Sequence, residues 1–350
     1  MSFFKEKLEI FKNNFKKFWR NTSKSNLPQE LIEITEKFII SDSFKNVSNY
    51  WHINNIKNYK QFMKTGLDSY SVNIDLSYFT FVYFDDKLIE NTFKNVENVK
   101  INYELNLFKK HQLLNYDQSY KYNLLLILVY ENLKKLEEYK LLKLLNNETF
   151  CGFNDPFLKI EGIKITQDKI NSLLEYHSIK NIPCFSKGGN TILEMGAGSG
   201  RIAEVILNFN EKFKYVICDI PLAIFISYSR LKKAFPKKKI SLCIDTKDKE
   251  EMMNKLLNND ILFIFPHQIQ FFEKKTFDIF MAIGCICEMD KKTIKRYMNY
   301  VDTHHLNLLN KAKIIVDHFR THVLPKIGGR AKAMVLASSR NQARLYKQEI

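Results

Sequence analysis

The sequence lacks the features that mark several large protein classes. Its six cysteines form no CxxC pair and show no zinc-ligand spacing with histidine, so neither a disulfide framework nor a zinc site is indicated. No apolar run reaches the ~20 residues that a membrane span needs, and the N-terminus carries no signal-peptide pattern. These absences favour a reducing, cytoplasmic setting.

Motifs of nucleic-acid enzymes are also missing. No GxxxxGK[ST] loop is present, which argues against an ATP-driven motor. Asn154-Asp155-Pro156-Phe157 lacks the second proline of the NPPY loop that amino-group methyltransferases of nucleic acids carry, and Pro183-Cys184 lies upstream of the place where a cytosine methyltransferase needs its nucleophile. The net charge of +16 would attract an acidic partner, but the lysines are dispersed, as on an ordinary solvated surface. Nucleic acid is therefore not expected as a partner.

The first part of the chain, residues 1–150, is predicted to be a mainly helical region that serves as a cap or substrate-binding part. Residues 77–84 are its best strand candidate, because they are β-branched and aromatic. Residues 3–19 form a basic amphipathic helix, which we expect to pack on the protein itself, with contact to an anionic membrane surface as the alternative. Its apolar stripe consists of Phe4, Leu8, Phe11, Phe15 and Phe18.

In the second part, residues 151–316, the pattern of apolar residues changes from about residue 190. Short apolar runs alternate with helical patterns: TILEMGAG and RIAEVILNF, then KYVICDI and LAIFISYSRLKKAF, then KISLCI and KEEMMNKLL, then ILFIF and FDIFMAIG. Buried strands that alternate with helices predict an α/β fold with a parallel sheet. Ligands of such sheets bind beyond the carboxyl ends of the strands, where the winding reverses.

The first of these strands ends in a glycine-rich loop. Gly196, Gly198 and Gly200 stand at alternate positions, where they permit positive φ and let the backbone approach a ligand. Arg201 fills the third glycine position of the GxGxxG loop that dinucleotide enzymes carry, which disfavours a nicotinamide cofactor. The form E/DxGxGxG is that of methyltransferases. Their cofactor, S-adenosylmethionine, carries a positively charged sulfonium, and an acidic residue at the end of the strand attracts this charge. The predicted cofactor contacts are Glu194, Gly196, Ala197, Gly198, Gly200 and Arg201.

The second strand ends at Asp219. An acid at this point is placed to accept hydrogen bonds from both ribose hydroxyls of a nucleoside, and Ile220 follows it directly. Both a dinucleotide and S-adenosylmethionine would use the acid, so Asp219 and Ile220 predict nucleoside binding without discriminating between the two cofactors.

The segments ILEMGAGSGRIAEVIL, KYVICDIPLAIFISYSRLKKAFP, ILFIFPHQI and FDIFMAIGCICEM together resemble the bacterial sugar O-methyltransferases, and CGFNDPF and ITQDKINSLLEYHSI match upstream segments of that family. The resemblance covers roughly residues 145–310. It implies a Rossmann-like class I methyltransferase sheet and S-adenosylmethionine as cofactor. It further implies that the glycine loop holds the methionine part, that Asp219 holds the ribose, and that the substrate is a sugar hydroxyl in polysaccharide biosynthesis.

Transfer to a hydroxyl usually needs a base near the alcohol. His267 follows the strand ILFIF and Glu288 follows FDIFMAIG, so both are candidate catalytic residues at carboxyl ends of strands. His267 could instead hydrogen-bond within a loop or contact the adenine edge. Glu288 and Asp290 have no third acidic or histidine partner nearby, so no metal is expected. We interpret His304 and His305, on a helical pattern, as structural.

The last part, residues 317–350, differs in composition. It holds four of the eight arginines, and four alanines occur between Ala331 and Ala343 although the first alanine of the chain is Ala197. It resembles a fragment of the motor subunit of type I restriction endonucleases, which suggests a fused reading frame with its junction near 310–318. Two alternatives to a sugar O-methyltransferase therefore stay open: a catalytically impaired cofactor-binding remnant and a nucleic-acid-modifying enzyme. The oligomeric state is not indicated.

Overall fold

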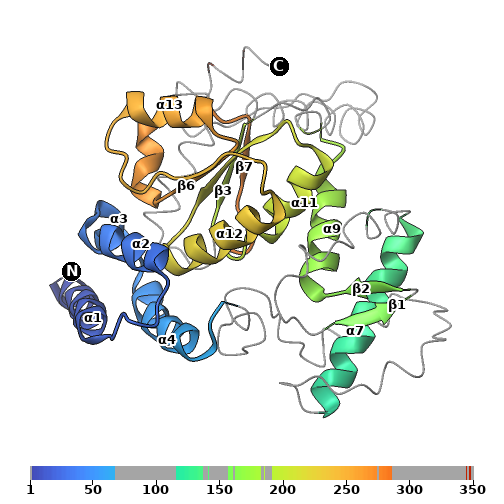
Figure 1. Ribbon diagram of the computed structural model, residues 1–350, viewed down its shortest axis with the longest axis horizontal. Helices are drawn as coiled ribbons and strands as arrows, with labels where there is room; N and C mark the ends of the chain where they lie inside the picture. Colours follow the sequence, from blue (N-terminus) through green and yellow to red (C-terminus); the bar gives the residue numbers. More distant parts are fainter. Residues whose placement is uncertain are drawn as a thin grey trace, which may run out of the picture. The chain divides into compact units, whose positions relative to one another are not determined.

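The computed structural model describes residues 2–67, 116–136, 141, 157–160, 162–182, 185, 191–273, 276–285, 344 and 347 (Figure 1). The chain divides into two compact units, Met1–Cys285 and Ile286–Ile350. All but two of the described residues belong to the first unit. Several predictions fall on residues outside these ranges. They concern the expected strand at 77–84, the candidate Glu288, the pair His304 and His305, and the tail at 317–350 apart from residues 344 and 347.

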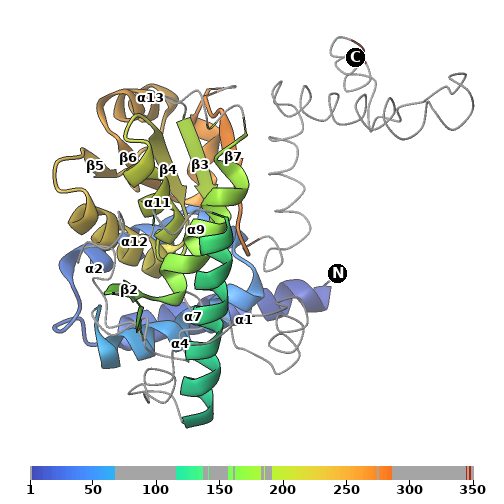
Figure 2. The same cartoon turned by 90° about the vertical axis from the view of Figure 1, so that its right-hand side faces the viewer.

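A parallel sheet of five strands forms the centre of the first unit, which makes the protein a mixed α/β protein as the sequence predicts. Its order is β5-β6-β4-β3-β7, and Figure 2 shows the strands side by side in this order. Every described side chain of β4 but the first is buried, because helices flank the sheet and the strand sequence is apolar throughout. The strands are β3 (Thr191–Met195), β4 (Lys214–Cys218), β5 (Ile240–Leu242), β6 (Ile261–Ile264) and β7 (Ile279–Met281).

The winding of the sheet reverses at β3. From β3 the chain proceeds to β4 on one side, whereas β7 pairs with the other side of β3. The sheet therefore extends in both directions from β3, and the carboxyl edge at such a reversal is the place where open parallel sheets bind their ligands. The residues that end β3 and β7 position the candidate site.

The helices that connect the strands begin at recognisable signals. Helix α11 (Arg201–Phe209) follows the glycine loop, and α12 (Pro221–Ala234) begins with a proline, which lacks the N–H that the first turn would leave unpaired. Asp248 caps α13 (Lys249–Asn258), since its side chain accepts the N–H of Glu251 at 2.8 Å. A 3₁₀ turn, η2 (Pro266–Phe271), follows β6. All three α-helices confirm predictions from the sequence.

Four N-terminal helices pack beside this sheet in the same unit. They are α1 (Ser2–Asn21), α2 (Gln29–Ile40), α3 (Asp42–Asn46) and α4 (Asn49–Thr65). Helix α1 packs on α4, and α2 and α4 pack on α12 (Figure 1). Phe15 of the predicted apolar stripe is buried, and so is Trp19, so this part of α1 faces the protein itself, as expected. None of the helices in the described ranges combines the length and the apolar content that a membrane span requires.

A hairpin and two further helices complete the described part of the first unit. The antiparallel strands β1 (Leu158–Ile160) and β2 (Ile163–Ile165) turn at Gly162, which has φ of 81°. We did not predict this hairpin, although the alternation of LKI and IKI around a glycine is its sequence signal. Helix α7 (Tyr116–Lys135) packs on α9 (Gln167–Ile179), and α9 in turn packs on α11.

Lys214, the first residue of β4, closes the end of α13. Its ammonium group donates to the carbonyl oxygens of Leu256 at 2.7 Å, Leu257 at 2.9 Å and Asn259 at 3.0 Å. We expect Lys214→Met to lower the free energy of unfolding by about 1–3 kcal/mol, because these carbonyls lose their donor. Urea titration measures the change. Lys255→Met, which removes a partly exposed ion pair with Glu251 and a hydrogen bond to Thr246, should cost less than Lys214→Met, and equal losses would contradict the capping role.

Candidate functional site

The glycine loop between β3 and α11 has the left-handed conformation that its sequence predicts. The φ angles are 70° at Gly196, 57° at Gly198 and 73° at Gly200. Other L-residues rarely adopt this region, so all three positions favour glycine on conformational grounds alone. Gly200 is the N-cap residue of α11, and the first N–H groups of that helix are therefore directed toward the loop.

Two of these glycines are also required by packing within the protein. A Cβ atom at Gly196 would overlap the Cβ atom of Cys285, which follows β7, and a Cβ atom at Gly200 would lie 3.0 Å from the Cβ atom of Ser227 on α12. The Cys285 thiol also contacts the carbonyl oxygen of Met195 at 2.9 Å. The sequence analysis assigned all three glycines to ligand approach. In the structure, Gly196 and Gly200 let β7 and α12 approach the loop.

Asp219 lies in contact with the glycine loop. Its Oδ2 atom accepts the N–H of Gly198 at 2.9 Å, and its Oδ1 atom accepts the N–H of Ile220 at 2.8 Å. Asp219 follows β4, whose last residue pairs with the last residue of β3, so the two loops leave the sheet side by side. The structure thus brings together the two elements that the sequence analysis assigned to one nucleoside site. Ile220 is buried beside them.

Glu194 lies inside the sheet, one residue before the end of β3. Its carboxyl group is buried, and it accepts a hydrogen bond of 2.7 Å from the hydroxyl group of Tyr215 on β4. Burial raises the pKa of Glu194 to about 7, although the Tyr215 hydrogen bond and the charge of Arg201 act in the opposite direction. The site therefore contains an acid whose charge changes near neutral pH.

This pKa predicts a stability that falls with increasing pH. Because the folded pKa of Glu194 lies near 7 and its ordinary value is 4.5, the folded state binds the proton more tightly than the unfolded state. The stabilisation is complete below pH 4.5 and disappears as the pH rises through about 7, a loss of about 3 kcal/mol. Urea titrations of the wild type and Glu194→Gln across this range measure it. If both proteins lose the same free energy, Glu194 is not the titrating group.

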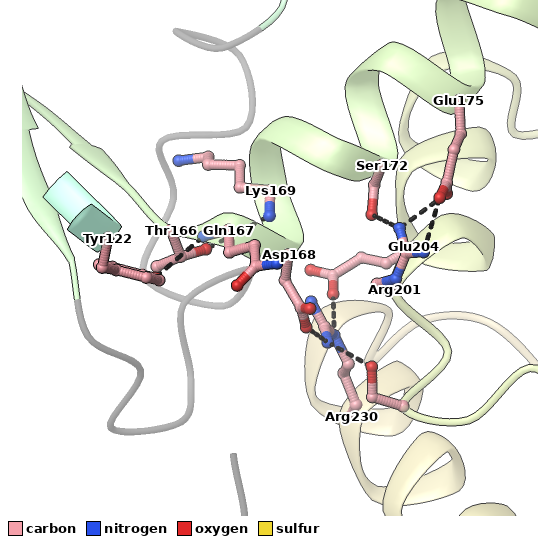
Figure 3. A network of polar contacts seen from close by, with 11 residues as sticks. Tyr122, Thr166, Gln167, Asp168, Lys169, Ser172, Glu175, Arg201, Glu204 and Arg230 are labelled. Carbon is pink, nitrogen blue, oxygen red and sulfur yellow. Dashed lines mark hydrogen bonds and ion pairs between the residues drawn. The ribbon is translucent and has the colours of Figure 1, made fainter. Parts of the chain in front are cut away.

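The Arg201 side chain is held by α9. Its guanidinium group donates to both carboxylate oxygens of Glu175 at 2.7 Å and to the hydroxyl group of Ser172 at 2.9 Å (Figure 3). We predicted Arg201 as a cofactor contact from its place after the loop. In the structure its side chain forms a bidentate ion pair within the protein.

A second arginine connects the loop to two helices. Arg230 of α12 is buried and donates to Glu204 at 2.7 Å, to Asp168 at 3.1 Å and to the hydroxyl group of the loop residue Ser199 at 3.2 Å (Figure 3). Burial raises the pKa of Glu204, and Arg230 opposes that shift. We did not predict this cluster from the sequence. Its signal is a charged residue within each of the apolar helix patterns RIAEVIL and FISYSRL.

His267, the candidate base, lies on η2 just after β6. Its Nδ1 atom and the hydroxyl group of Ser43 on α3 are 2.8 Å apart, and its backbone N–H donates to the same hydroxyl oxygen at 2.9 Å. Proton uptake from a ligand would therefore use Nε2. It requires the tautomer with the proton on Nδ1, in which the Ser43 oxygen accepts both hydrogen bonds. The second candidate, Glu288, lies outside the described residues.

Comparisons with protein-family models, with curated proteins and with solved structures gave no match to this chain. The chemistry of the site must therefore be argued from its own groups. The Asp219 carboxylate after β4 could bind the ribose of a nucleoside. The glycine loop, with the first N–H groups of α11 beside it, could bind a charged tail of the same ligand. Within the described residues, no group of three or more His, Cys, Asp or Glu side chains could hold a metal ion.

Proposed function

We propose that the protein is a cytoplasmic S-adenosylmethionine-dependent O-methyltransferase that acts on a hydroxyl group of a sugar or glycan precursor. The observation that carries the proposal is the hydrogen bond between the Gly198 N–H and the Asp219 carboxylate at the carboxyl edge of the parallel sheet. This hydrogen bond joins the loop of the form ExGxGxG after β3 to Asp219, the acid that follows β4. The proposed fold is accordingly a Rossmann-like class I methyltransferase sheet.

Each part of the site has a place in this proposal. The Asp219 carboxylate would accept hydrogen bonds from the ribose hydroxyls, and the backbone of the loop around Gly198 would hold the methionine part. S-adenosylmethionine supplies a methyl group on a positively charged sulfur. Glu194, whose pKa lies near 7, provides negative charge beside the loop when it is ionised, and this charge favours a cationic ligand over a neutral one.

His267 is our candidate for the group that takes the proton of the sugar hydroxyl. It follows the carboxyl end of β6, on the same edge of the sheet as Asp219, and its contact with Ser43 fixes the ring. Ser43 belongs to the N-terminal helical region, so this region would complete the site rather than only shield it. Glu288 remains the second candidate.

The test is a transfer assay with methyl-labelled S-adenosylmethionine and a panel of nucleotide sugars, oligosaccharides and DNA. We expect label in a sugar fraction, and its loss in His267→Gln. Cofactor binding without transfer to any acceptor would favour the catalytically impaired remnant. Label in DNA, together with DNA affinity that falls steeply with salt, would favour a nucleic-acid-modifying enzyme. A vesicle-binding assay with anionic lipid tests separately whether residues 3–19 contact a membrane surface.

A further inference from the structure

Helix α9 presents one polar face to the glycine loop and the helices that follow it. Asp168, Ser172 and Glu175 are spaced by four and three residues and therefore lie on the same face of the helix. Ser172 and Glu175 bind Arg201, the first residue of α11, while Asp168 binds Arg230 (Figure 3). Arg201, which follows the loop, and Arg230, which contacts Ser199 in the loop, are thus both matched by acids from α9.

Arg201 is an unusual residue at its position. A cation at the first residue of a helix opposes the positive end of the helix dipole, and here it also stands directly after the loop that would receive a cationic ligand. Arg201 and Glu175 act in opposite directions on buried Glu194: the arginine lowers the pKa of Glu194 and the Glu175 carboxylate raises it. Both charges therefore lie within electrostatic reach of the site, and their effects there are opposite in sign.

We propose that Glu175 is a positioning residue that sets the preference of the site for the charge of its ligand. It neutralises Arg201, so that the loop accepts a positively charged sulfonium instead of repelling it. The inference rests on the proposed function, since it concerns the same cofactor site. Glu175 itself need not touch the ligand, because it acts through the two hydrogen bonds that it accepts from the Arg201 guanidinium at 2.7 Å.

The pair S-adenosylmethionine and S-adenosylhomocysteine reports on this role directly. The two molecules share the adenosine and amino-acid parts but differ in the charge on sulfur, which is positive in the first and absent in the second. The ratio of their dissociation constants therefore isolates the effect of ligand charge. Isothermal titration of the full chain with each ligand gives the ratio for the wild type and for Glu175→Gln, Arg201→Gln and the double variant.

We expect opposite shifts in the two single variants. In Glu175→Gln the uncompensated arginine should weaken the binding of S-adenosylmethionine about tenfold more than that of S-adenosylhomocysteine. This is the effect expected of one charge at roughly 10 Å in a protein environment. In Arg201→Gln the uncompensated carboxylate should shift the ratio the other way. The double variant, which carries neither charge, should return the ratio to that of the wild type.

A purely structural ion pair predicts a different pattern. Because both side chains of the pair are partly exposed, at 21% and 27%, their loss should change the unfolding free energy little and weaken both ligands alike. A constant ratio across the four proteins would overturn the inference while leaving cofactor binding intact. A wild type that binds neither ligand would overturn the proposed function as well. Glu251→Gln, which breaks a comparable surface pair with Lys255 on α13, is the control and should not move the ratio.

Discussion

Replacement of Arg230 by methionine is expected to lower the free energy of unfolding by about 3–5 kcal/mol. Arg230 is the shared partner of two buried carboxylates, Asp168 and Glu204, whose side chains are 4% and 0% exposed. Without the guanidinium group these carboxylates lose their compensating charge in a medium where an isolated charge is costly. Urea denaturation followed by circular dichroism measures the loss.

The matched control is Arg201→Met. Arg201 also binds a carboxylate of α9, and its geometry is the better of the two because both of its contacts with Glu175 measure 2.7 Å. However, this pair is partly exposed, so its loss should cost clearly less than the loss of Arg230. Similar losses in the two variants would show that burial does not determine the energetics of this network.

Asp219→Ala is expected to weaken S-adenosylmethionine binding on the order of 1,000-fold, because each of the two charge-assisted hydrogen bonds that we propose between Asp219 and the ribose would contribute about 1.5–3 kcal/mol. The substitution also removes the acceptor of the Gly198 N–H, which holds the loop against β4. Asp219→Asn retains an oxygen that can accept this N–H but lacks the charge. We therefore expect an intermediate affinity for Asp219→Asn, measured by isothermal titration.

Asp278→Ala is the control for this experiment. The Asp278 carboxylate accepts the backbone N–H of Thr191 at 2.9 Å, the same kind of bond that Asp219 forms, but at the amino end of β3. This substitution should affect stability and leave cofactor affinity unchanged. If Asp278→Ala weakens cofactor binding as much as Asp219→Ala does, the loss of affinity in Asp219→Ala results from a general loss of structure and not from lost contacts with the cofactor.

The local sequence pattern predicted the sheet because each strand from β3 to β7 is a short apolar run beside a helical pattern. The ends of α11 agree with the segment RIAEVILNF, since the glycine loop and Asn210 bound it on either side. The hairpin of β1 and β2 was missed because each of its strands has only three residues. In so short a segment, two alternating apolar residues are easily taken for part of a helical or loop segment.

The site could be predicted only as far as its residues are adjacent in sequence. Glu194 lies one residue before the end of β3, and the glycines and Asp219 follow the ends of β3 and β4, so their meeting at one edge of the sheet was foreseeable. Tertiary partners were not: Tyr215 on Glu194, Cys285 against Gly196, and Glu175 on Arg201 come from separate elements. Burial is the main cause of the raised pKa of Glu194, and Tyr215, Arg201 and Glu175 modify that pKa further. Pattern alone therefore predicted which residues of the candidate site lie together, but not its electrostatics.

Titration of the purified full chain with S-adenosylmethionine tests the central claim most directly. The account predicts saturable binding of one molecule per chain, and its loss when Gly198→Val places a β-branched side chain at a φ of 57° beside the Asp219 carboxylate. Absence of binding to the wild type, or undiminished binding to Gly198→Val, would contradict the assignment of this loop to a sulfonium cofactor.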